Sequence, residues 1–293
     1  MSLPLLAPLI AAFGYTIAAL MLKRATGQGV DPWRITFVAN WMMMAVFSVL
    51  WLGPTPHSFS WTNFAHASLC GALFFIGQFF TFLALSRGDV SVATPVLGTK
   101  VILVALFAVF LGQMALTPGI WLAVVLTATA TALLGASGGT AHHALWKSLL
   151  YGFSAAGAFA LTDVLQQRWA KLWGFPHFFA ALFLSVAVLS LGLIPFFHGS
   201  LWEMGSKVWR WTVLGGCLLA LQSMALCWGI VTIGATISNV LYNSRGIWSV
   251  VLVWTIGHWF GNSERAQGRS VMLRRLCGSA LLLVAIILIT RPA

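Results

Sequence analysis

Long apolar runs recur along the whole sequence, and each is about as long as a helix that crosses a membrane. A hydrocarbon core of roughly 30 Å requires about 20 residues of α-helix. Ten such runs can be marked in this chain, at about 3–22, 33–52, 62–86, 91–112, 117–136, 144–168, 176–197, 208–231, 236–258 and 270–290. The runs are continuously apolar and do not alternate, which favours helices over barrel strands. The sequence therefore predicts an all-α integral membrane protein with ten transmembrane helices.

The composition agrees with this fold class. Of 293 residues, 60% are hydrophobic and only 7% are charged, whereas a soluble domain carries about a quarter of its residues as charged ones. The connections between the runs are short, so no soluble domain is expected beside the bundle. The first run lacks a basic leader and is predicted to remain as a helix instead of being a signal peptide.

The net charge of +11 is distributed unequally between the two sides of the predicted bundle. The connections after odd-numbered runs carry Lys23, Arg24, Arg34, Arg87, Lys147, Lys207, Arg210, Arg265, Arg269, Arg274 and Arg275, and the other side carries Arg168, Lys171 and Arg291. Basic loops remain in the cytoplasm, so the termini are predicted to lie outside an inner (plasma) membrane. The orientation of the protein in the lipid bilayer is enough to explain its net positive charge, so no nucleic-acid partner is expected.

Landmarks repeat at a separation of about 144 residues. Gln78 aligns with Gln222, Gly71 with Gly215, and Pro32 with Pro176. We interpret residues 1–140 and 141–293 as two five-helix repeats of one membrane domain. Because five is odd, the second repeat must enter the membrane from the opposite side, as in secondary transporters that alternate access to a central cavity.

Two segments carry a resemblance to a known family: "SVATPVLG", which contains Pro95, in the fourth run and "TISNVLYNSRG" in the ninth. With the five-plus-five pattern, they resemble the drug/metabolite transporter superfamily, its EamA-like ten-helix exporters, and among these the YddG-type amino-acid exporters of bacterial inner membranes. The resemblance implies efflux of aromatic and other neutral amino acids and related small metabolites through a central cavity.

Other functions stay open at the level of the sequence. A nucleotide-sugar or sugar-phosphate carrier and a multidrug effluxer belong to the same superfamily, and a membrane sensor or channel is a different class. No GxSxG, HExxH or paired-acid motif indicates an enzyme. No cofactor or metal is expected, because the four cysteines have no metal-ligand spacing. Small-residue runs such as 127–136 allow a monomer or a weak homodimer.

Amide side chains at depth are candidates for substrate binding. Gln78 and Gln222 occupy matching positions and can either join helices or line the cavity, because an amide in hydrocarbon needs a partner. Asn239 and Asn243 are one turn apart, with Tyr242 beside them, and can together offer donors and acceptors to a ligand.

Three apolar candidates accompany these amides. Pro95 removes a backbone donor, so it predicts a kink near the cavity. Trp41 and Trp228 lie deeper than the interfacial tryptophans. Each can pack in the core or stack on an aromatic substrate.

Lys100 and Arg245 lie about eight to nine residues inside the fourth and ninth runs and align after a one-residue slip. A charge at that depth costs about 3 kcal/mol even on the lenient insertion scale, so both should face the interior. In a structural role, Lys100 binds carbonyls freed by Pro95 and Arg245 binds Asn or Gln neighbours. In a functional role, one or both hold the substrate carboxylate.

Asp163 is the only one of five acidic residues expected within the bilayer. It can pair locally with Arg168, or it can titrate and couple efflux to protons. Because buried carboxylates are so scarce, an anionic or zwitterionic substrate is favoured over a cation.

Overall fold

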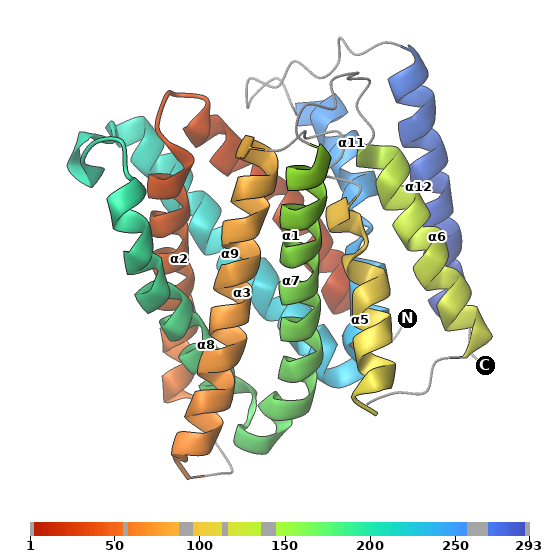
Figure 1. The fold of residues 1–293 in the computed structure, drawn as a ribbon, viewed down its shortest axis with the longest axis horizontal. Coiled ribbons are helices and arrows are strands. Elements are labelled where there is room, and N and C mark those ends of the chain that lie inside the picture. Colours follow the sequence, from red (N-terminus) through yellow and green to blue (C-terminus); the bar gives the residue numbers. More distant parts are fainter. Residues whose placement is uncertain are drawn as a thin grey trace.

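The structure is a computed structural model that describes residues 3–54, 58–87, 96–112, 117–135, 145–256 and 269–290. The regular structure of these residues is helical (Figure 1). The first half contains α1 (Leu3–Thr26), α2 (Pro32–Ser48), η1 (Val49–Leu52), α3 (Trp61–Arg87), α5 (Lys100–Phe110) and α6 (Pro118–Gly135). The second half contains α7 (Leu145–Trp173), α8 (Phe175–Ser190), η2 (Leu191–Phe196), η3 (Leu201–Glu203), α9 (Ser206–Ile233), α10 (Ala235–Tyr242), α11 (Arg245–Ile256) and α12 (Arg269–Thr290).

Several described helices have the length and apolar character of transmembrane segments. Six are long enough to cross a membrane: Leu3–Thr26, Pro32–Leu52, Trp61–Ala84, Trp146–Trp173, Phe175–Phe196 and Ser206–Ile233. Shorter apolar helices cover Val96–Phe110, Pro118–Leu133 and Cys277–Leu288. The chain is therefore an integral membrane protein. The number of ten transmembrane helices remains a prediction.

The two halves interleave and do not form separate packed bodies. Helix α1 packs along α9, α3 along α7, and α6 along α12, so each of these pairs joins one half to the other (Figure 1). Other helix contacts occur in equivalent pairs, in which each helix of one half is replaced by the helix at the same position in the other half. The pair α3–α8 has its counterpart in α9–α2, and α5–α7 has its counterpart in the packing of α10 and α11 on α1.

Two predicted helices are irregular in their middle. The run 236–258, expected as one helix, is split by a turn at Asn243 and Ser244, and α11 begins at Arg245. The run 91–112 has a turn at Thr99, immediately before Lys100. The expectation of continuous helices is wrong here for a local reason.

The reason is that side chains at both turns bind backbone carbonyls. Thr99 Oγ1 donates to Val96 O at 2.6 Å, and Asn243 Nδ2 donates to Asn239 O at 2.8 Å. Asn, Ser and Thr side chains compete with helical hydrogen bonding in this way. Both turns use tighter backbone bonds three residues apart, such as Ser244 N to Leu241 O at 3.1 Å. Each deep cation consequently lies at the start of a new helical segment.

An aromatic cluster fills the space between α2, α3, α7 and α8. Its fully buried members include Phe47, Trp173, Phe178 and Phe183. The rings of Phe47 and Phe183 stack with centroids 4.0 Å apart. This cluster is the largest apolar core of the described residues and closes the bundle between the centre and one end of these helices.

Candidate functional site

A cavity of about 550 Å³ lies between the two halves. Lys23 and Thr26 at the end of α1 and Pro32 at the start of α2 line one end of it, which we call the mouth. Met43 and Phe183 line the opposite end and belong to the aromatic cluster. The cavity is therefore reached from the α1–α2 connection and is closed towards the other side of the bundle.

Lys100 and Asp163 form an ion pair in the wall of this cavity. Lys100 Nζ lies 2.7 Å from Asp163 Oδ2, which joins α5 to α7. The Lys100 side chain is 19% exposed and the Asp163 side chain 9%. Asp163 thus pairs with a cation far away in the sequence, and the predicted local pairing with Arg168 is not what the structure shows.

The Asp163 carboxylate has further partners that hold it in place. Asn239 Nδ2 on α10 donates to Oδ2 at 2.8 Å, and Gln166 Nε2 donates to Oδ1 at 3.2 Å. One turn further along α7, Gln167 Oε1 accepts a hydrogen bond from Ala235 N at 2.7 Å. These contacts fix Asp163 between α7 and α10, at a site where an isolated carboxylate would be costly.

Arg245 lines the same cavity in a different environment. Its guanidinium carbon lies 5.0 Å from the ring centroid of Tyr15 and 4.9 Å from that of Tyr242. Such cation–π contacts stabilise a partly desolvated cation. No ion pair joins Arg245 to an acidic side chain in the described part of the chain. Its nearest described partners are thus the two tyrosine side chains.

Lys100 and Arg245 have similar surroundings, contributed by residues that are about 144 positions apart in the sequence. Lys100 Nζ lies 5.7 Å from the ring centroid of Phe159, and Phe159 follows Tyr15 by that same spacing. The correspondence ends at Asp163, whose counterpart in the first half is Ala19. One cation of the cavity therefore has a carboxylate and its counterpart does not. The repeat spacing could have identified Tyr15, which sequence analysis missed.

The predicted amides both line the cavity and bind other side chains. Gln78 and Asn40 exchange two hydrogen bonds, each 3.0 Å long, between α3 and α2. Gln222 Oε1 accepts from Tyr242 Oη at 3.1 Å and thereby ties α9 to α10. All four side chains line the cavity, so joining helices and lining the cavity are compatible roles here.

Other predicted residues lie outside the cavity lining. Asn239 and Asn243 are buried and bind protein atoms. Trp228 lines an apolar groove formed with α1 and the start of α8, and Trp41 lies near Phe37 on α2. Pro95 falls outside the described residues.

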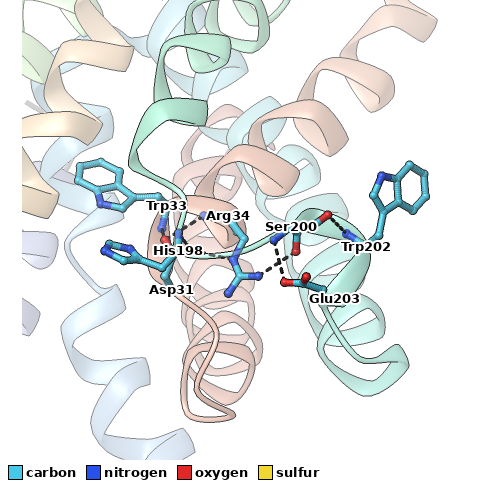
Figure 2. A network of polar contacts seen from close by, with 7 residues as sticks. All are labelled: Asp31, Trp33, Arg34, His198, Ser200, Trp202 and Glu203. Carbon is cyan, nitrogen blue, oxygen red and sulfur yellow. Dashed lines mark hydrogen bonds and ion pairs between the residues drawn. The ribbon is translucent and has the colours of Figure 1, made fainter.

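A polar network lies beside the mouth (Figure 2). Asp31 caps the N-terminus of α2, and Arg34 Nε donates to Asp31 Oδ2 at 2.7 Å. Arg34 also donates to Ser200 O at 2.9 Å, while Ser200 N donates to Glu203 Oε2 at 2.9 Å. His198 N contributes a further bond to Asp31. The network joins the α1–α2 connection to the segment between α8 and α9, so it fixes one rim of the mouth.

Comparison with known proteins agrees with this architecture. No curated protein matches the chain. One crystal structure shares 20% sequence identity and superimposes with a TM-score of 0.72, covering 100% of this chain and 99% of its own. At that identity the likeness establishes the fold alone. Residues 2–136 match the EamA-like transporter family. The chain is thus an integral membrane protein whose first half is similar in sequence to EamA-like transporters.

Proposed function

We propose that this protein is a secondary transporter that exports amino acids and related small metabolites bearing a carboxylate. The observation that carries the proposal is the cavity of about 550 Å³ at the interface of the two halves, with Lys100, Asp163 and Arg245 in its wall. Ligand sites span roughly 300–1,000 Å³ and combine an apolar lining with a few polar groups. With Lys23 at the mouth, the described lining carries three cations and one acid, which favours a substrate with a negative group.

Alternating access is supported by the arrangement of the helices. A cavity between interleaved halves can open at either end if the halves rock against each other. The mouth carries the polar side chains of Lys23 and Thr26, whereas the other end is closed by the aromatic cluster. Under the charge-based orientation the mouth faces the cytoplasm, where an exporter loads its substrate. A channel would need a continuous path, which the aromatic cluster blocks.

Counterflow in proteoliposomes tests this function. Vesicles containing the purified protein and unlabelled L-phenylalanine should accumulate labelled L-phenylalanine, because exchange through a carrier is faster than net flux. The cavity variant Arg245→Gln should lower the rate at least about tenfold, the factor expected for losing a charge-assisted hydrogen bond of about 1.5–3 kcal/mol. Lys171→Met removes an exposed cation at the end of α7 and should leave the rate unchanged.

Two results would contradict the proposal. Equal label in protein-containing and protein-free vesicles would refute transport of this amino acid. Equal rates for Arg245→Gln and Lys171→Met would show that the Arg245 charge does not act on the substrate. Sugar phosphates and quaternary amines, added as competitors, test the other substrate classes of the superfamily.

A further inference from the structure

We infer that the Lys100–Asp163 ion pair is the element that selects zwitterions, because the substrate's ammonium replaces that of Lys100 on Asp163 while the released Lys100 binds the substrate's carboxylate. This inference rests on the proposed transport of amino acids. It assigns Asp163 to the ammonium group of the substrate, for which the cations of the cavity lining offer no partner.

The first step is that Asp163 already holds an ammonium group at the cavity wall. Lys100 Nζ, 2.7 Å from Asp163 Oδ2, has the chemistry and the distance of an amino-acid ammonium bound to a carboxylate. The Lys100 side chain is thus a tethered competitor for a binding position that faces the cavity.

The second step is that the two partners differ in mobility. Asp163 receives hydrogen bonds from Asn239 and Gln166, and it is almost buried. Lys100 has a flexible four-carbon stem, and its remaining described contact is the Phe159 ring, 5.7 Å away. When the pair opens, Lys100 should move and Asp163 should stay fixed.

The third step is the balance of charges. A zwitterion inserted into the pair converts one ion pair into two and adds no net charge to the cavity. A simple carboxylate would take Lys100 and leave Asp163 without its cation, and a simple amine would leave Lys100 without its anion. Either buried charge would be unpaired, which is strongly unfavourable. The pair therefore favours molecules that carry both groups.

The position of Arg245 is consistent with this division. Among the described residues it forms no ion pair with an acidic side chain, so it can attract the negative group of the substrate without opening an ion pair. The counterpart of Asp163 in the first half is Ala19, so the described cavity lining beyond the mouth provides one acidic side chain for an ammonium and two cations for a carboxylate.

Binding of three related probes to the purified full-length protein tests the exchange. The probes are L-phenylalanine, 3-phenylpropionate, which lacks the ammonium, and 2-phenylethylamine, which lacks the carboxylate. Calorimetry at constant pH should give L-phenylalanine the highest affinity, by about tenfold or more over either single ion.

The two single variants should change the preference in opposite directions. Asp163→Asn leaves Lys100 unpaired, so the affinity ratio of 3-phenylpropionate to L-phenylalanine should rise by about tenfold or more. Lys100→Gln leaves Asp163 unpaired, so the same rise should appear for 2-phenylethylamine. Arg168→Gln, on the same helix as Asp163 but exposed at its end, should preserve the parent's ratios.

A measurement on the parent protein keeps the test valid if a variant fails to fold. Binding of 2-phenylethylamine to Asp163 should release Lys100 from the ion pair. The carboxylate of 3-phenylpropionate then binds a Lys100 ammonium that is already free. Saturating 2-phenylethylamine should therefore raise the affinity for 3-phenylpropionate, which is positive coupling between two ligands.

The outcomes separate this inference from the proposed function. If the parent binds L-phenylalanine but neither variant changes the ratios, or if the two single ions bind without coupling, the exchange is refuted and the pair has a structural role. If the parent binds none of the three probes, the amino-acid function fails, and the exchange fails with it.

Discussion

The contact between α3 and α8 at Gly71 allows a quantitative test of the packing. A Cβ atom at Gly71 would lie 2.6 Å from Leu182 O and 2.9 Å from Ser185 Cβ. To reach an ordinary separation of 3.4 Å, the carbonyl would have to retreat by about 0.8 Å. Leu182 O is a backbone atom, so α8 as a whole must shift. The hydrogen bond from Ser185 Oγ to Ser68 Oγ, 3.0 Å long, crosses the same contact.

Gly71→Ala should therefore destabilise the protein, and Gly157→Ala on α7 is its matched control. Overpacking of this kind costs about 1–3 kcal/mol, whereas replacing a helical glycine by alanine gains up to about 1 kcal/mol. Nothing lies within 4 Å of a Cβ at Gly157. Because both variants gain helix propensity equally, the difference between their free energies of unfolding isolates the packing cost of about 1–3 kcal/mol.

The assay is reversible unfolding of purified protein in mixed detergent micelles, followed by circular dichroism. Gly215→Ala provides an intermediate case, because its Cβ would meet Leu22 Cδ2 at 2.8 Å, a side-chain atom that can move. The expected order of stability is Gly157→Ala, then Gly215→Ala, then Gly71→Ala. Equal stability of Gly71→Ala and Gly157→Ala would refute the close approach of α3 and α8.

Three further results are expected. A double-mutant cycle with Asn40→Leu and Gln78→Leu should give a coupling energy of about 0.6–1.7 kcal/mol in the same unfolding assay, as for other hydrogen bonds between membrane helices, and a value of zero would contradict the reciprocal amide pair. Asp31→Ala removes the cap of α2 and the ion pair of the network at the mouth, and should cost about 2 kcal/mol in free energy of unfolding; an unchanged stability would mean that the network does not hold the rim. In a background without native cysteines, Ser58→Cys should react with an impermeant thiol reagent added to intact cells and Gln28→Cys should not; the reverse labelling would overturn the predicted orientation.

Much of the architecture could be predicted from the sequence, because its causes are local. A run of about 20 apolar residues must form its backbone hydrogen bonds within itself in a membrane, so the helices follow from hydropathy and length. The depth of Lys100, Arg245 and Asp163 follows from their positions in these runs. The interruptions of the fourth and ninth helices at Thr99 and Asn243 could not be predicted from hydropathy. They depend on whether these side chains adopt rotamers that hydrogen-bond to backbone carbonyls.

The tertiary structure alone decided how the charges are paired. The sequence placed Lys100 and Asp163 at depth but could not join them, because their helices meet only through the packing of α5 on α7. Contacts between other helices decided the places of Gln78, which pairs with Asn40 of α2 in the cavity wall, and of Trp228, which faces an apolar groove beside α1. Hydropathy indicates how much free energy it costs to place a side chain in hydrocarbon. The partner that offsets this cost belongs to another helix, so only the packing of the helices determines which partner it is.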